Sequence, residues 1–168
     1  GLDTSGRVRF YPVDSAHGFF TGASVVPQNQ WTHVAVTYNG AGDARIYVNG
    51  VLDAQSSAYT VPAPTDTAAL CVGADRGDAG TNFYWRGSLD EVQIWSGVRS
   101  QAQIQQEMTV SPGDPFYFPS GAYHNLRAFW NFENSPISSA IDFARESGDQ
   151  NFLTYVNGDF NTSVPKIL

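Results

Sequence analysis

The stretch "QWTHVAVTYNGAGDARIYVNGVLDAQSS" (30–57) constrains the fold more than any other part of the chain. Apolar and polar side chains alternate along it with a period of two, because successive side chains of a strand point to opposite faces. Turn residues at 41–43 end the first run, and Asn49-Gly50, the strongest short hairpin signal, ends the second. The stretch predicts three consecutive antiparallel strands, with Ile46 and Val48 facing inward.

Short strands are expected elsewhere too, because 16 Gly and 9 Pro residues supply frequent turns. A helix is expected only within 96–108, where Ser100 can cap it and Ala102, Ile104 and Met108 form a short apolar stripe. A chain of 168 residues suffices for one domain. We predict an all-β fold, an antiparallel two-sheet jelly-roll sandwich with one short helix. The other expected strands are 6–13, 69–75, 83–95, 126–134 and 152–160.

The expected strand 83–95 breaks its own alternation. In "GSLDEVQIW" (87–95), Val92 and Ile94 occupy the apolar face, and the same frame carried backward places Asp90 there instead of Leu89. A β-bulge at Asp90-Glu91 would return Leu89 to the core and point Asp90 toward a neighbouring loop. A carboxylate beside turn carbonyls suits Ca²⁺, which prefers oxygen ligands. The alternative is a carboxylate that caps a backbone N–H without a metal.

The net charge of −7 limits the possible partners. Nucleic acids and anionic lipids require a basic surface, and no basic stretch is present, whereas an acidic surface favours divalent cations. No stretch is long and apolar enough for a membrane span. A lone cysteine, Cys71, cannot form an internal disulfide and is expected to be a small buried apolar residue.

Several motifs together resemble one family. The segments "QWTHVAVTYNGAGDARIYVNGVLDA", "LCVGADRGD" and "YWRGSLDEVQIWSGVRSQAQIQQEM" occur in the order typical of laminin-G-like domains of the concanavalin A-like lectin/glucanase fold. The resemblance covers residues 6 to 108 and implies a jelly roll. It also implies an extracellular or cell-surface location.

The end of the chain departs from the order of that family. The segment "NLRAFWNFENSPISSAIDFARESGDQNF" resembles the opening of a laminin-G-like module but comes last here. It could begin a second module of a tandem array, reflect a circular permutation, or complete the sheet of a neighbouring molecule. We expect 1–110 to form the main part of the jelly roll, 111–125 a Pro/Gly-rich connection, and 126–168 a strand-loop-strand segment packed into the same sandwich or a neighbour's.

The resemblance also implies a structural Ca²⁺ site. In this fold the Asp of the matching strand often holds calcium together with backbone carbonyls and an acidic residue of the opening segment. Carried over to this chain, that nominates Asp90, with Glu133 and Asp142 as further ligands. Asp75 and Asp78, in the "DRGD" loop, could hold a second ion associated with a ligand.

The sequence favours binding over catalysis. Glucanases of this wider fold carry paired acidic residues on one strand, and retaining hydrolysis needs two carboxyl groups about 5 Å apart. No such run occurs, and adjacent Asp90 and Glu91 make poor acid and base partners. Sugars stack on exposed aromatic rings, for which Tyr84 and Trp85 are candidates. We therefore expect no catalytic residues and a calcium-stabilised binding module for glycans or an extracellular protein. The alternatives are a self-associating adhesive repeat and a glycoside hydrolase.

Overall fold

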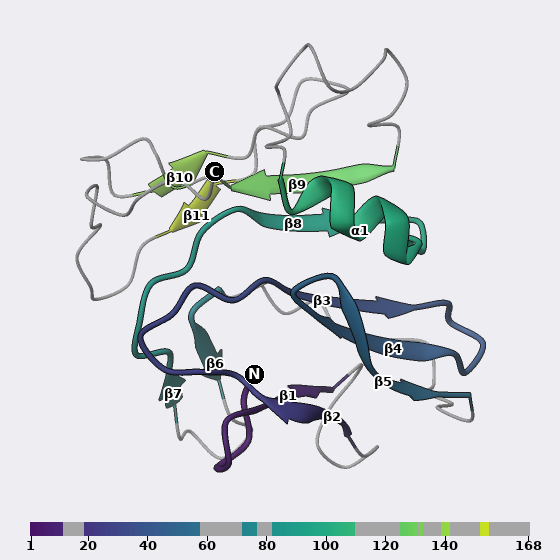
Figure 1. Cartoon of the computed structure of the whole chain (residues 1–168). Helices are drawn as coiled ribbons and strands as arrows, with labels where there is room; N and C mark the ends of the chain where they lie inside the picture. Colours follow the sequence, from purple (N-terminus) through teal and green to yellow (C-terminus); the bar gives the residue numbers. More distant parts are fainter. Residues whose placement is uncertain are drawn as a thin grey trace. The chain divides into compact units, whose positions relative to one another are not determined.

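The computed structural model describes residues 1–11, 19–57, 72–76, 82–109, 125–130, 132, 139–141 and 152–154 (Figure 1). Within these ranges every paired strand is antiparallel and one short helix is present, which confirms a mostly antiparallel β fold. The chain forms two compact units: Gly1–Asp66 with Gly97–Val110, and Thr67–Ser96 with Ser111–Leu168. The first unit contains β1 (Arg7–Phe10), β2 (Phe20–Val25), β3 (Val34–Tyr38), β4 (Ala44–Val48), β5 (Val51–Ser56) and α1 (Gln101–Glu107).

The predicted meander is confirmed: β3, β4 and β5 form one sheet in chain order (Figure 1). Val48 pairs with Val51 across a two-residue turn, in which Asn49 and Gly50 both have positive φ, as such a hairpin requires. Ile46 is buried as expected, but Tyr47 is also buried and Val48 only half-buried. The central strand β4 is therefore covered on both faces, which alternation alone did not predict.

Strands β1 and β2 form a second ladder in this unit, with a shift in its register. Arg7 lies opposite Val25, whereas Arg9, two residues later, lies opposite Thr21. Strand β2 thus carries two extra residues within Gly22–Ser24, and their amides are displaced from the regular ladder. No alternating pattern marks β2, because its middle consists of Gly, Ala and Ser.

The helix α1 lies within the predicted segment, and Ser100 caps it as expected. The Ser100 hydroxyl accepts from the Gln103 amide at 3.3 Å, and the Gln103 side chain accepts from the Ser100 amide at 2.9 Å. Of the expected apolar stripe, Ile104 is buried but Ala102 is exposed. The side chains of Gln101 and Gln105 each donate to the Gly50 carbonyl at 3.0 Å, so the helix is tied to the β4–β5 turn.

The second unit contains β6 (Ala74–Arg76), β7 (Asn82–Tyr84), β8 (Val92–Trp95), β9 (Leu126–Trp130), β10 (Ser139–Ile141) and β11 (Phe152–Thr154). These strands pair as β6–β7, β8–β9 and β10–β11. Ala128 and Trp130 of β9 form a buried cluster against which Val92 and Phe132 pack. The segment 126–130 thus pairs with a strand of the laminin-G-like region, while the predicted domain boundaries stay a prediction. Among the described residues, no helix has the length and apolar character needed to cross a bilayer.

Candidate functional site

Asp90 precedes β8 and accepts a hydrogen bond from a backbone amide. Its Oδ1 accepts from the Glu91 N–H at 2.9 Å, and the residue is half-buried. Glu91 has φ of 52°, in the left-handed region that side chains rarely adopt. The carboxylate therefore stabilises a tight turn immediately before the strand.

The expected long strand with a bulge is wrong. The structure has two strands, β7 and β8, separated by residues 85–91, and the register shift of β8 and β9 lies instead at Ile94/Trp95. Leu89 does not return to the core, because 37% of it remains exposed, as does Ile94. Asp90 and Glu91 lie outside both strands, and Glu91 has a positive φ, so the alternation of β8 does not extend back to Asp90.

The predicted calcium site is not tested by the described residues. Asp90 is the one nominated metal ligand among them, since Glu133 and Asp142 lie outside the described ranges. Within those ranges, no three His, Cys, Asp or Glu side chains cluster as a metal site would. The calcium site stays a prediction whose remaining donors would come from residues beyond those described.

Trp85 is the nominated ligand-binding residue whose side chain the structure describes. The residue is 41% exposed, and its backbone N–H donates to the Gly73 carbonyl at 2.8 Å. A Cβ on Gly87 would lie 3.1 Å from the indole Nε1, so the ring lies over a residue that has no side chain. An exposed, positioned indole offers an apolar face and an N–H donor to a ligand.

The other nominated ligand-binding residues are located only by their backbone or not at all. Asp75 lies in β6, opposite Phe83 of β7, and Tyr84 pairs with Ala74 in the same ladder. Asp78 lies outside the described residues. Tyr84 and Trp85 are therefore consecutive at the end of β7, next to the β6–β7 ladder.

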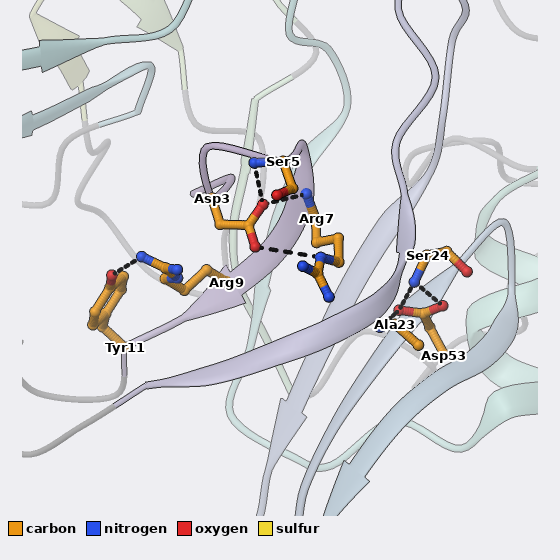
Figure 2. A network of polar contacts seen from close by, with 8 residues as sticks. All are labelled: Asp3, Ser5, Arg7, Arg9, Tyr11, Ala23, Ser24 and Asp53. Carbon is orange, nitrogen blue, oxygen red and sulfur yellow. Dashed lines mark hydrogen bonds and ion pairs between the residues drawn. The ribbon is translucent and has the colours of Figure 1, made fainter.

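The carboxylate at a β-bulge is Asp53, which the sequence analysis did not single out. In the β4–β5 ladder Ile46 pairs with Ala54 and Tyr47 with Leu52, so Asp53 is the extra residue. Figure 2 shows its carboxylate against β2: Oδ2 accepts from the Ala23 N–H at 2.7 Å, and Oδ1 from the Ser24 N–H at 3.0 Å. A Cβ on Gly22 would lie 2.4 Å from Oδ2, so only glycine allows this approach.

The environment of Asp53 favours the charged form. Burial alone would raise the pKa of Asp53, but hydrogen bonds from Ser24 and Ala23 outweigh burial and hold the pKa below its ordinary value of 3.8. The register shift in β2 displaces the amides of Ala23 and Ser24 from the β1–β2 ladder. The Asp53 carboxylate accepts the hydrogen bonds of these two amides. Asp53 therefore links the two sheets of the unit, and its role here is structural.

A turn near the chain start uses a second carboxylate in the same way (Figure 2). Asp3 Oδ1 accepts from the amides of Ser5 and Arg7, both at 2.8 Å, and Oδ2 lies 3.4 Å from the Arg7 guanidinium. These contacts, the Arg7 amide foremost, lower the pKa of Asp3. Asp3 thereby orders the approach to β1.

An aromatic and cationic cluster lies at the end of the β1–β2 ladder. Arg9 Nη1 donates to the Tyr11 hydroxyl at 3.0 Å, as Figure 2 shows. The Arg9 guanidinium carbon lies 4.2 Å from the centre of the Phe19 ring. Tyr11 and Phe19 are 37% and 51% exposed, with ring centres 5.7 Å apart. The sequence analysis missed this cluster, although Tyr11 and Phe19 flank the β1–β2 connection.

His33 bonds to the β4–β5 turn through its backbone. Its N–H donates to Asn49 Oδ1 at 3.0 Å, and its carbonyl accepts from the Asn49 N–H at 2.9 Å. The Nδ1 of its side chain is buried without a hydrogen-bond partner among the described residues. Burial lowers the pKa of His33, so the ring is held neutral.

Comparison with known proteins identifies the family. The family model described as the concanavalin A-like lectin/glucanases superfamily, of laminin-G type, matches residues 1–105. A solved "putative carbohydrate binding protein" from Bacteroides ovatus is 19% identical, with a TM-score of 0.55 over 92% of this chain and 48% of that one. An S-layer domain-containing protein from Clostridium thermocellum is 21% identical, with a TM-score of 0.44 over 62% of this chain and 64% of that one.

The chain thus spans less than two thirds of either solved chain. No curated protein sequence matches it. At these identities the Bacteroides ovatus structure supports the fold alone. The family match covers more than half of the chain, and it agrees with the confirmed meander, helix and antiparallel strands. The chain belongs to the concanavalin A-like lectin/glucanases superfamily.

Proposed function

We propose that the chain is a non-catalytic carbohydrate-binding module of an extracellular or cell-surface protein. The observation that carries the proposal is Trp85, an exposed residue at the end of β7 whose backbone N–H bonds to Gly73 and whose indole lies against Gly87. Its Nε1 has no hydrogen-bond partner in the described part of the chain and can donate to a sugar hydroxyl. The lectin-like family and the Bacteroides ovatus protein support this choice of ligand.

An aromatic face suits a sugar better than it suits most other ligands. The C–H groups on one side of a pyranose ring form a flat apolar surface that covers an indole, while its hydroxyls stay available for hydrogen bonds. The backbone of Trp85 is fixed by its hydrogen bond to Gly73 and the indole lies against Gly87, so little conformational freedom is lost when a sugar stacks on the ring. Removal of the ring should therefore abolish most of the affinity.

A glycan array followed by titration calorimetry tests the proposal. Trp85→Ala should weaken binding of the glycans found on the array by about tenfold or more, since one stacked aromatic contributes about 1–3 kcal/mol in comparable recognition. Trp31→Ala is the matched control, because Trp31 is also exposed but belongs to the other compact unit. An array without glycan binding, or equal losses in both variants, would contradict the proposal.

The proposed calcium site has its own test. We propose that Asp90, with Glu133 and Asp142, holds a Ca²⁺ ion that stabilises the second unit. Addition of CaCl₂ should raise the melting temperature of the wild type, and Asp90→Asn should remove that increase. Asp43→Asn is the control, because Asp43 pairs with Arg45 and belongs to the first unit. An equal calcium response in Asp90→Asn and the wild type would exclude Asp90 as a ligand.

The non-catalytic part of the proposal rests on the carboxylates. Asp90 and Glu91 are adjacent, and Asp90 accepts a hydrogen bond from the Glu91 amide. This arrangement differs from the two facing carboxyl groups of a retaining glycosidase. Bound oligosaccharides should therefore be recovered intact after long incubation. Release of reducing ends by the wild type would overturn this part.

A second candidate function is assembly with another copy of the chain. Strand β3 is an edge of its described sheet, and its Val34 and Val36 side chains are exposed. An exposed apolar edge can pair with a strand of a second molecule. Light scattering should then show self-association that Val36→Lys abolishes. A wild-type chain that stays monomeric at high concentration would contradict the assembly function.

A further inference from the structure

The geometry points to a second, anion-selective sugar site formed by Arg9, Tyr11 and Phe19, with a uronic acid residue as its ligand. This inference rests on the proposed function, because it names a class of glycan that the module recognises. It concerns residues of the first unit, whereas the Trp85 site belongs to the second. The two sites can therefore be tested separately.

The three side chains form one surface at the end of a ladder. Phe10 pairs with Phe20, so Tyr11 and Phe19 are the next residues outward on the two strands, and Arg9 lies two residues before Tyr11. The rings of Tyr11 and Phe19 are tilted at 57°, and the guanidinium carbon lies closer to Phe19, at 4.2 Å, than to Tyr11, at 5.9 Å. The contact with Phe19 positions the guanidinium. Its Nε is buried, so a ligand would meet the Nη groups.

Arg9 differs from the ion-paired arginines of its own unit. Arg7, Arg45 and Arg99 pair with Asp3, Asp43 and Glu107 respectively. Arg9 has no carboxylate partner among the described residues, and its one side-chain hydrogen bond goes to the Tyr11 hydroxyl. Among the described carboxylates, Asp3 feels the charge of Arg9, which contributes to its lowered pKa, but none of them forms an ion pair with Arg9.

Both polar groups of the cluster retain donors for a ligand. Tyr11 accepts from Arg9 through its hydroxyl oxygen, so the hydroxyl hydrogen is available to a second acceptor. Arg9 Nη2 has no partner in the described ranges, and Nη1 has a further N–H. A carboxylate at the guanidinium edge could accept from Arg9 and from the Tyr11 hydroxyl together.

A uronic acid fits this set of contacts better than a neutral sugar or a simple anion. Its ring can stack on the exposed Phe19 or Tyr11 face, and its carboxylate can meet the guanidinium. A small anion would not use the aromatic faces, and a neutral sugar would form no charge-assisted hydrogen bond with Arg9. The net charge of −7 repels polyanions in general, so binding of a polyuronate would depend on this local contact.

The test compares two forms of one ligand. Short oligogalacturonates and their fully methyl-esterified forms differ only at the carboxyl groups, where the ester adds a methyl group and removes the charge. Both are titrated into the complete chain by calorimetry. We expect the free acid to bind at least about tenfold more tightly than the ester, because a charge-assisted hydrogen bond contributes about 1.5–3 kcal/mol. Raising the salt concentration should reduce the difference in affinity between the free acid and the ester.

Substitutions then test whether Arg9 and Phe19 cause the difference in affinity between the free acid and the ester. Arg9→Gln should remove the preference for the free acid, and Phe19→Leu should weaken both ligands. Arg127→Gln is the matched control, because Arg127 is an exposed arginine of the other unit with no ion pair among the described residues, and its substitution removes the same charge. Melting temperatures equal to that of the wild type show that the variants remain folded.

The outcomes separate this inference from the proposed function. Preference for the free acid that is lost in Arg9→Gln and kept in Arg127→Gln supports the site. Equal affinity for acid and ester, or equal effects of the two arginine variants, overturns the site but leaves a carbohydrate-binding module. Array glycans that bind through Trp85 while neither galacturonate form binds would also overturn the site alone, and binding of no glycan at all would overturn both.

Discussion

Replacement of Asp53 should show how much the two sheets of the first unit depend on one carboxylate. Asp53→Ala leaves the amides of Ala23 and Ser24 without their acceptor, at positions where the β2 bulge has already displaced them from the ladder. A hydrogen bond to a charged group contributes about 1.5–3 kcal/mol when buried. Asp53 is only half-buried and both amides can reach water, so we expect a loss of about 2 kcal/mol in total.

Urea unfolding followed by tryptophan fluorescence measures this loss. A decrease of about 2 kcal/mol corresponds to a melting temperature lower by about 4–8 °C in a chain of this length. Asp43→Ala is the matched control: Asp43 pairs with Arg45 at 2.9 Å, but the two side chains are 32% and 40% exposed. Such a surface ion pair contributes at most about 1 kcal/mol.

The pH dependence gives the sharper test. Because the pKa of Asp53 is lowered in the folded state, its contribution is fully present above the ordinary value of 3.8 and is lost as the pH falls through the folded value. The stability difference between the wild type and Asp53→Asn should therefore be constant at neutral pH and shrink in acid. An equal loss in Asp53→Ala and Asp43→Ala, or a difference that persists unchanged in acid, would refute the linking role of Asp53.

Three further predictions concern the same unit. Gly50→Ala should destabilise it by about 1–3 kcal/mol in urea, because the new Cβ would lie 2.8 Å from both Gln105 Cγ and Met108 Sδ at a φ of +71°; stability equal to that of the wild type would contradict the tight turn–helix contact. Ser100→Ala should lower stability by about 1 kcal/mol through loss of the helix cap, and Ser100→Asp should largely restore it; no loss in the alanine variant would argue against the capping box. Since burial lowers the pKa of His33, stability should fall as the pH drops below the ordinary value of 6.5, and His33→Gln should flatten that slope between the ordinary and the lowered value; identical pH profiles would place the titration elsewhere.

The parts of the fold that the sequence predicts well are those set by local chemistry. The Asn49-Gly50 turn and the alternating runs on either side of it appear as β3, β4 and β5, and Ser100 caps α1. In each case the residues that carry the pattern also make the contacts, so neighbours in the sequence suffice for the prediction. The family resemblance rests on these segments and is confirmed by the match over residues 1–105.

The missed features depend on residues far apart in the chain. Gly22 in β2 looks like a strand breaker until Asp53, thirty-one positions later, is seen to need the space of a missing side chain. The broken alternation at Asp90 predicted a bulge there, but the ladder registers place the irregularities at Asp53 and between Ile94 and Trp95. Arg9 and Phe19 likewise meet only because β1 pairs with β2.

The tie between α1 and the Gly50 carbonyl has a consequence for synthesis on the ribosome. The first unit consists of Gly1–Asp66 and Gly97–Val110, so its helix is made only after thirty residues of the other unit have emerged. A seven-residue helix has little stability alone. Until the helix has been synthesised, the Gly50 carbonyl of the hairpin lacks the hydrogen bonds from Gln101 and Gln105. The nascent unit therefore remains incomplete, with the Gly50 carbonyl lacking both glutamine donors, until residue 110 has left the exit tunnel.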